Sequence, residues 1–163
     1  MGPRIVTFFF GYTDTSYGNM EGCKSITGYV FLAGNGVISW CSRKQISVTL
    51  SSTEAEYVAL SEAAQEACWL RSLYSKLSLL QKEVPTMIQG DNEGSIAMAK
   101  NPQFHKQSKH IEIRWHWVRD LVQEGKIYVN SCRDPEQTAD VLTKALLRPK
   151  HTKHTSDMGL VSV

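Results

Sequence analysis

The sequence predicts an α/β fold with a mixed sheet, on the strength of three observations. The first part of the chain holds three runs rich in β-branched and aromatic residues, at 5–13, 26–33 and 37–42. After Ser51 a helical apolar period replaces the strand pattern. Strands and helices then alternate along the rest of the chain. Three antiparallel strands followed by this alternation imply a five-stranded mixed sheet with helices on its faces.

The first three predicted strands follow one another closely. Residues 5–13 form an almost unbroken apolar and aromatic run. Between 26–33 and 37–42, a Gly-Asn-Gly sequence at 34–36 supplies residues that tolerate positive φ, as a tight turn requires. We therefore expect a hairpin, with 5–13 as a third antiparallel strand.

A long helix is predicted from Ser51 to Leu77. Ser51 followed by Glu54 has the pattern of a capping box, which favours a helix start. Apolar residues then recur with helical spacing at Ala59, Leu60, Ala63, Ala67, Leu70, Tyr74 and Leu77.

Shorter elements follow this helix. A strand is predicted at 86–90, and a helix at 93–100 ends before the Asn-Pro pair at 101–102. A second long helix is expected at 109–124, with Gly125 as its C-terminal stop.

The chain is expected to end with a strand, a helix and a tail. The strand is predicted at 126–131, and the helix runs from Asp134 to about Leu147 because aspartate followed by proline suits a helix start. We expect one domain over residues 1–147 and a loosely ordered basic tail over 148–163.

Composition is that of an ordinary globular chain. The 163 residues are 42% hydrophobic and 21% charged, which suits a single soluble domain, and we expect it to be monomeric. No apolar run reaches the roughly 18 residues of a membrane span. The net charge of +2 is too small to indicate a partner.

The cysteines contain no CxxC pair and are widely spaced, at Cys23, Cys41, Cys68 and Cys132. A domain of this length can form a core without disulfides, so we expect reduced, mostly buried thiols in an intracellular protein. A disulfide framework is the less favoured alternative.

Two aspartates follow predicted strands. Asp14 comes directly after 5–13, and Asp91 directly after 86–90. Neighbouring strand ends form the edge of an α/β sheet where ligands bind, so these carboxylates are candidates for a functional site. The alternative is that both are turn or cap residues, where aspartate is common.

Helix geometry separates two glutamates and leaves one aspartate undecided. At about 100° per residue, Glu56 shares the buried side of its helix, while Glu54 faces solvent as a cap residue. A buried carboxylate is costly unless it is paired or binds a cation, which makes Glu56 the anomalous acid. Pattern alone favours a surface position for Asp140, with Lys144 as its partner at i+4.

Seven motifs follow one another along the chain: YTDTSYG (12–18), SITGYVF (25–31), ISWCSRKQ (38–45), SSTEAEYVAL (51–60), GDNEGSIAMAKNP (90–102), KHIEIRWHWVRD (109–120) and QTADVLTKAL (137–146). In these motifs the chain resembles the ribonuclease H domain of copia-type LTR retrotransposon polyproteins, which lies C-terminal to the reverse transcriptase. The match extends from about Gly11 to Leu147, and the tail sequence TSDMGL fits the same position in the family.

The resemblance implies a ribonuclease H-like fold, in which two parallel strands follow the three antiparallel ones, and a site of four carboxylates. These are Asp14, Glu56, Asp91 and Asp140, so the resemblance replaces the surface interpretation of Asp140. Oxygen-only ligands suit two Mg²⁺ or Mn²⁺ ions, without which four clustered acids would repel one another.

The implied activity is that of a metal-dependent endoribonuclease. It would hydrolyse the RNA strand of an RNA–DNA hybrid during reverse transcription and leave 5′-phosphate and 3′-hydroxyl ends. The implied partners are the hybrid and the reverse transcriptase domain of the same polyprotein, inside a cytoplasmic virus-like particle.

Two groups of residues are candidates for contacts with the hybrid. In relatives, the motifs that hold Asn19, Ser52 and Asn92 touch the minor groove, although turn and cap roles are an equal alternative here. Lys106 and Lys109 belong to a basic segment, 100–119, that could bind phosphates or form a solvated helix face. A zinc site formed by the histidines of this segment, His105, His110 and His116, lacks the usual ligand pairing.

One departure from the family bears on the mechanism. Many ribonucleases H have a histidine in the loop before the last aspartate, and residues 131–138 contain none. We expect the reaction to survive this change, because the metal ions do the main work, and the change bears on the rate and on the identity of any general acid. The alternative function is a non-catalytic nucleic-acid-binding domain that supports a neighbouring polymerase. The presence of all four carboxylates favours catalysis.

Overall fold

A computed structural model describes residues 8–79, 84–100 and 109–161 of the chain. The elements follow one another as β1 (Phe9–Met20), β2 (Lys24–Ala33), β3 (Gly36–Lys44), α1 (Ser52–Lys76), β4 (Thr86–Gly90), α2 (Glu93–Lys100), α3 (Lys109–Gln123), β5 (Ile127–Ser131), the 3₁₀ turn η1 (Asp134–Glu136), α4 (Asp140–Thr143) and α5 (Arg148–Asp157).

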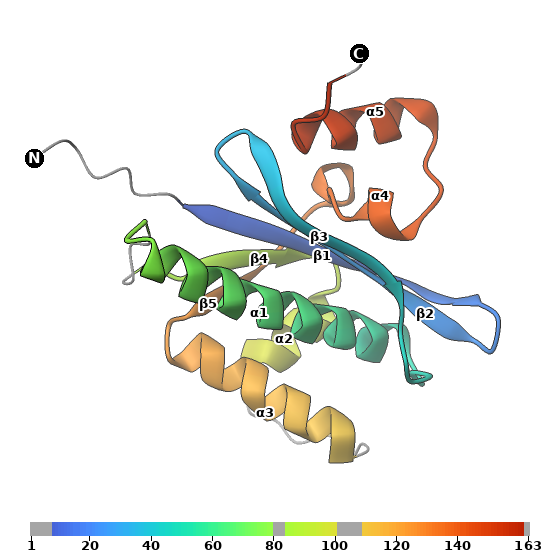
Figure 1. Cartoon of the computed structure of the whole chain (residues 1–163). Helices are drawn as coiled ribbons and strands as arrows, with labels where there is room; N and C mark the ends of the chain where they lie inside the picture. The colour runs from blue at the N-terminus through green and yellow to red at the C-terminus, as the bar shows by residue number, and fades with distance from the viewer. Residues whose placement is uncertain (1–7, 80–83, 101–108, 162–163) are drawn as a thin grey trace, which may run out of the picture.

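The five strands form one mixed sheet in the order β3-β2-β1-β4-β5 (Figure 1). β1 pairs antiparallel with β2, and β2 pairs antiparallel with β3. β4 lies parallel to β1 on its other side, and β5 lies parallel to β4. The predicted sheet of three antiparallel strands followed by two parallel ones is confirmed.

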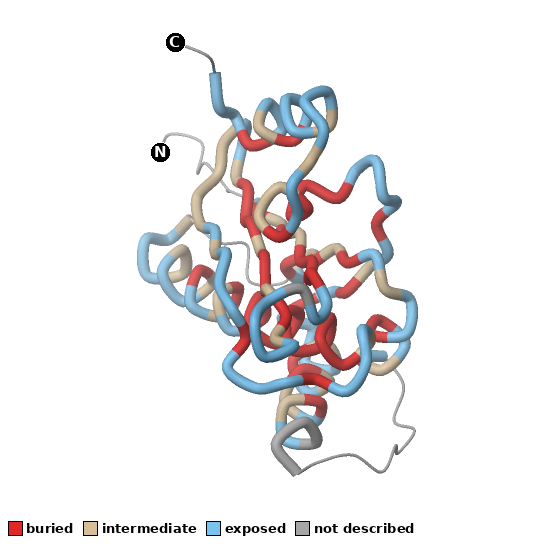
Figure 2. Tube along the Cα trace, turned by 90° about the vertical axis from the view of Figure 1, so that its right-hand side faces the viewer, coloured by how far each residue is buried: buried red, intermediate tan, exposed pale blue. Residues whose placement is uncertain are grey.

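Helices cover both faces of this sheet. α1, α2 and α3 lie on one face, and α4 and α5 lie on the other (Figure 1). The larger core lies between the sheet and α1, α2 and α3, where Tyr57, Ile88 and Trp115 are buried. A smaller core joins Val30 of β2 to the opposite layer. Buried residues accordingly run through the middle of the molecule, with exposed segments outside them (Figure 2).

The first strand is longer than the sequence suggested. Of the predicted range 5–13, residues 5–7 lie outside the described part of the chain, and β1 continues through Asp14 to Met20. Asp14 is therefore within β1, paired with Gly28 of β2, and does not mark the end of the strand. The polar Thr15 and Ser16 continue the pairing because β2 provides backbone partners as far as Lys24.

α1 begins with the predicted capping box. The Ser51 side chain accepts a hydrogen bond from the Glu54 backbone N–H at 3.1 Å, and the Glu54 carboxylate accepts one from the Leu50 N–H at 2.7 Å. The expectation that Glu54 faces solvent is wrong, since it is only 6% exposed. Its side chain turns back over the helix start, and this covers the carboxylate.

The predicted helix from Asp134 to about Leu147 is also wrong. The chain forms η1, then the single turn α4, and Lys144 is already extended. Gln137 explains the break, because its buried amide donates to the Thr13 carbonyl of β1 at 3.1 Å and its side-chain oxygen accepts from the Ala139 N–H at 3.3 Å. The bond to Thr13 holds Gln137 against β1, and the bond from Ala139 occupies the side-chain oxygen of Gln137. Residues 134–147 therefore do not form one continuous helix.

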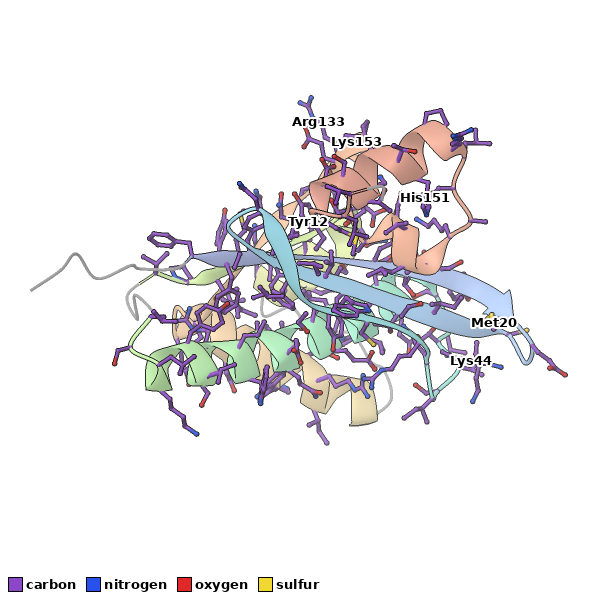
Figure 3. The ribbon with its side chains drawn as sticks, turned by 45° about the horizontal axis from the view of Figure 1, so that its top comes forward. Tyr12, Met20, Lys44, Arg133, His151 and Lys153 are labelled. Atoms are coloured by element: carbon purple, nitrogen blue, oxygen red, sulfur yellow. The ribbon has the colours of Figure 1, made fainter. Side chains whose placement is uncertain are left out.

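The expectation of a loosely ordered tail is wrong for residues 148–157, which form α5. His154 and Met158 are buried, and the Met158 carbonyl accepts a hydrogen bond from the Val37 N–H at 3.0 Å. Tyr12 of β1 projects toward the same layer and packs against this smaller core (Figure 3). The last helix is thus part of the folded unit.

Two expectations from composition can be compared with the structure. All four cysteines are free, as predicted. The expectation that they are mostly buried is wrong, because Cys132 is buried, Cys41 and Cys68 are half-buried and Cys23 is exposed. Among the described residues, no helix combines the length and the apolar character needed to cross a bilayer.

Candidate active site

The sheet register brings two of the predicted acids together. β1 and β4 run parallel, with Tyr12 opposite Gln89. Asp14 and Asp91 each come two residues later in the chain, so the same register places them side by side. β4 ends at Gly90, whereas β1 continues. Asp91 therefore follows a strand end, as predicted, and Asp14 lies beside that end within the longer strand.

Glu56 joins them from α1, which packs against β1. Its side chain is 8% exposed, and its carboxylate accepts a hydrogen bond from the backbone of Thr15. Asp14, Glu56 and Asp91 each offer one carboxylate oxygen, and these three atoms lie within 4.8 Å of one another. The expected burial of Glu56 is confirmed, but burial does not separate the two glutamates, since Glu54 is buried as well. They differ in their partners: Glu56 lies with Asp14 and Asp91, whereas Glu54 caps α1. We call these three residues the acidic cluster.

Burial and mutual repulsion control the protonation of this cluster. Burial, followed by the charges of Asp14 and Asp91, raises the pKa of Glu56 to about 9. Burial also raises the pKa of Asp14 to about 6, although a hydrogen bond from Thr143 and the charge of Lys144 oppose this shift. The cluster is therefore costly to ionise unless a cation compensates the charge.

Asp140 lies beside the cluster but is held differently. It is 1% exposed, so the surface interpretation of this residue is wrong. Lys144 Nζ lies 3.0 Å from Asp140 Oδ1, as the i+4 spacing predicted, and 3.2 Å from Asp14 Oδ1. Lys150 Nζ of α5 lies 2.6 Å from Asp140 Oδ2. The fourth acid is thus connected to the first by an ammonium group and is not one of the three mutually close ligands.

Sequence reasoning missed two residues that contact Asp14. The Thr143 hydroxyl donates to Asp14 Oδ2, and Lys144 pairs with Oδ1 of the same carboxylate. Burial lowers the pKa of Lys144, but the carboxylates of Asp14 and Asp140 outweigh it and keep the ammonium group charged. A signal was present, because Thr143 and Lys144 follow Asp140 by three and four residues and so share its side of a helical turn.

The candidate hybrid contacts are only partly visible. Ser52 is exposed at the start of α1. Asn92 caps α2, since its side-chain oxygen accepts from the Ser95 N–H at 2.9 Å, so the cap role considered for it is confirmed. Lys106 lies outside the described residues, and Asn19 and Lys109 are described only in their backbone.

The basic segment 100–119 is partly engaged within the protein. Lys100 lies over the Tyr128 ring at 5.3 Å, and the Arg114 guanidinium donates to Ser61 Oγ at 3.3 Å. Of its histidines, His116 is exposed, His105 lies outside the described part of the chain, and the side chain of His110 is not described. Within the described ranges, the acidic cluster is the one group of three or more candidate metal ligands.

The donor set of the cluster fits a hard divalent cation. Carboxylate oxygens are the ligands that Mg²⁺ and Mn²⁺ prefer, and here three converge from three different elements. The pKa values of Glu56 and Asp14 are raised to about 9 and about 6, and a bound cation would supply positive charge that favours the ionised form of both carboxyls.

Sequence comparison relates the chain to retrotransposon polyproteins. It is 40% identical over 141 residues to the retrovirus-related Pol polyprotein from transposon TNT 1-94 of Nicotiana tabacum, which covers 86% of the chain. It is 37% identical over 153 residues to the corresponding polyprotein from transposon RE1 of Arabidopsis thaliana, which covers 93% of the chain. The chain spans about one tenth of the length of these relatives. No family model matches it.

Structure comparison identifies the fold. LC11 ribonuclease H1, isolated from compost, aligns with a TM-score of 0.62 and 18% identity over 83% of this chain and 92% of that protein. The structure of LC11 ribonuclease H1 in complex with an RNA/DNA hybrid aligns with a TM-score of 0.59 and 17% identity, over 83% and 93% of the two chains. The chain therefore belongs with the Pol polyproteins of copia-type retrotransposons, as a segment that has the ribonuclease H fold.

Proposed function

We propose that this chain is a metal-dependent endoribonuclease that hydrolyses the RNA strand of RNA–DNA hybrids. The observation that carries the proposal is the acidic cluster, whose three carboxylate oxygens lie within 4.8 Å on a ribonuclease H fold. Asp14, Glu56 and Asp91, with Asp140 beside them, would hold two Mg²⁺ or Mn²⁺ ions. Bound there, the ions would supply Lewis acidity for activating a water and stabilising the leaving 3′ oxygen, and the products would carry 5′-phosphate and 3′-hydroxyl ends.

The residues of the chain prepare this site in distinct ways. β1 holds Asp14 in the centre of the sheet, and Thr143 fixes the orientation of its carboxylate by a hydrogen bond. The first turns of α1 carry Glu56 into the buried side of the cluster. Asp91 is the most exposed of the three, so it forms the side of the site that faces an incoming substrate.

The substrate assignment is supported by a solved structure with the same fold. LC11 ribonuclease H1, which shares the fold, has been solved in complex with an RNA/DNA hybrid. We propose that Asn19, Ser52 and Asn92 contact the minor groove of such a hybrid, where the RNA 2′-hydroxyls are displayed. Lys106 and Lys109 would then bind its phosphates.

The biological setting follows from the polyprotein relatives. They are about ten times as long as this chain, so we propose that the domain acts beside the reverse transcriptase of the same polyprotein, in an intracellular particle. Reverse transcription leaves the template RNA paired with new DNA, and the activity would remove that RNA. As an isolated domain the chain is expected to be monomeric.

A second candidate is a binding domain without catalysis. Two observations favour it: residues 131–138 contain no histidine, and Asp140 is paired with two lysines outside the acidic cluster. Such a domain would bind hybrid without cleaving it in the presence of either cation.

Incubation with end-labelled substrates distinguishes the two candidates. The nuclease is expected to cut the RNA strand of a hybrid in Mg²⁺ or Mn²⁺ and to spare single-stranded RNA and duplex DNA. Chelator is expected to stop the reaction. Equal cleavage of single-stranded RNA, or activity that persists in chelator, would overturn the proposal.

A further inference from the structure

Both carboxylate oxygens of Asp140 are bound by ammonium groups of the chain itself. Lys144 Nζ lies 3.0 Å from Oδ1, and Lys150 Nζ lies 2.6 Å from Oδ2. Asp140 is almost fully buried, so water cannot replace these partners without a local rearrangement. A carboxylate with both oxygens engaged in this way has reduced capacity to serve as a metal ligand.

Lys144 connects this pair to the acidic cluster. Its ammonium lies between Asp140 and Asp14, 3.2 Å from Asp14 Oδ1, while the second oxygen of Asp14 accepts from Thr143. The Asp14 side chain has no solvent exposure. A positive charge of the protein therefore lies beside the acidic cluster, where it repels any divalent cation that binds there.

Lys150 has a second partner that would allow it to leave. Besides Asp140, its ammonium lies 2.7 Å from Asp134 Oδ1, and Asp134 is largely exposed in η1. Lys150 can therefore release Asp140 and remain paired at the surface. The contact also connects α5 to the site, because Lys150 lies in the first turn of that helix.

We propose that Lys144 and Lys150 are built-in counter-ions that keep Asp140 apart from the acidic cluster and compete with divalent cations for the carboxylates of Asp14 and Asp140. The inference rests on the proposed function, since it concerns the same metal site. It deepens that function by assigning to the chain a device that sets how much divalent cation the site needs. Occupation of the Asp140 side requires at least one ammonium group to withdraw.

Replacement of each lysine by methionine tests the competition, with the midpoint of the Mg²⁺-induced rise in melting temperature as the readout. Lys144→Met and Lys150→Met are each expected to lower the half-saturating Mg²⁺ concentration by about five-fold or more, because each change removes a like charge from the site. Lys150→Arg keeps the charge and is expected to stay near the wild-type midpoint.

Lys153→Met is the matched control. Lys153 lies on α5, the same helix as Lys150 (Figure 3). Its ammonium pairs with Asp157 at 2.8 Å and not with Asp140. Lys153→Met removes the same charge from α5 as Lys150→Met does. Because Lys153 does not pair with Asp140, the Mg²⁺ midpoint of this variant is expected to remain close to wild type.

The outcomes separate the inference from the proposed function. Midpoints that stay unchanged or rise in both Lys144→Met and Lys150→Met overturn the inference. An equally large fall of the midpoint in Lys153→Met also overturns it. Both results count whether or not the wild-type protein cleaves hybrid. Lower midpoints in Lys144→Met and Lys150→Met support it even if no variant cleaves hybrid, in which case only the proposed function fails. If either Lys144→Met or Lys150→Met does not fold, the Mg²⁺ midpoint of the remaining one, compared with that of Lys150→Arg, tests the inference.

Discussion

At the scale of single residues, the site places carboxylates where their ionisation lowers the stability of the fold. Glu56 and Asp14 are carboxylates taken out of water without enough partners to favour the ionised form, which raises the pKa of each. Thr143 and Lys144 relieve Asp14, while Glu56 has only a backbone hydrogen bond and the more distant charge of Lys144. Side chains selected for stability alone would not be placed in this way.

The raised pKa values predict how stability without metal depends on pH. Glu56 titrates near 4.5 when unfolded and at about 9 when folded, so between these values the folded chain holds a proton that the unfolded chain has lost. The free energy of unfolding therefore falls as pH rises through this window. Asp14 contributes with the same sign between 3.8 and about 6.

Melting curves in chelator at several pH values check this prediction. The melting temperature of the wild-type protein is expected to fall relative to that of Glu56→Gln between about pH 5 and about pH 9, because glutamine cannot ionise. Mg²⁺ is expected to restore more stability at the upper end of this range. If the melting temperatures of the two proteins change in parallel with pH, Glu56 does not have the raised pKa assigned to it.

Thr143 offers a second prediction at this scale. Thr143→Val keeps the shape of the side chain but removes the hydroxyl that donates to Asp14. Loss of a hydrogen bond to a buried carboxylate is expected to cost about 1 to 3 kcal/mol of unfolding free energy. Denaturant unfolding measures this loss, and Thr143→Ser should recover most of it. A serine variant as unstable as the valine variant would point to lost packing as the cause.

At the scale of elements, the position of α4 depends on a single glycine. Gly28 of β2 lies opposite Asp14, and a Cβ atom added there would meet Thr143 Cγ2 at 2.5 Å and Leu142 Cβ at 3.1 Å. Only glycine allows α4 to approach β2 this closely. The approach sets the distance of Asp140, Thr143 and Lys144 from the acidic cluster.

Gly28→Ala is therefore expected to displace α4 as well as to destabilise the fold. Overpacking of this kind costs about 1 to 3 kcal/mol, and hybrid cleavage should fall further than the loss of folded protein explains. Gly36→Ala is the matched control, since a Cβ atom there meets nothing within 4 Å and its stability should change by less than about 0.5 kcal/mol. Cleavage by folded Gly28→Ala at the wild-type rate would mean that α4 does not position the site.

At the scale of the whole molecule, the central architecture could be predicted from sequence and the last third only in part. The apolar runs and the change of period located the five strands and the two long helices, because these features reflect which side of an element is buried. The phase of α1 predicted the burial of Glu56 for the same reason, although it wrongly placed Glu54 in solvent. Such local patterns are visible in one sequence.

What sequence reasoning missed depends on contacts between distant residues. Gln137 ends a helix that local propensity favoured, through a hydrogen bond to Thr13 more than a hundred residues away. α5 is ordered by contacts of Met158 with the sheet, although its own composition is strongly polar. The burial of Asp140 depends on the same packing, so it could be inferred only from the family resemblance.

The measurement that tests the central claim most directly is cleavage of an RNA–DNA hybrid in Mg²⁺ by wild type, Glu56→Gln and Glu54→Gln. The two variants make the same chemical change two residues apart, one in the acidic cluster and one in the cap of α1. Wild type is expected to cleave the RNA strand, and Glu56→Gln to lose about 100-fold or more of the rate while remaining folded. Glu54→Gln is expected to cleave normally and to lose at most about 1 kcal/mol of stability. Cleavage by Glu56→Gln at the wild-type rate would show that the acidic cluster is not the nuclease centre.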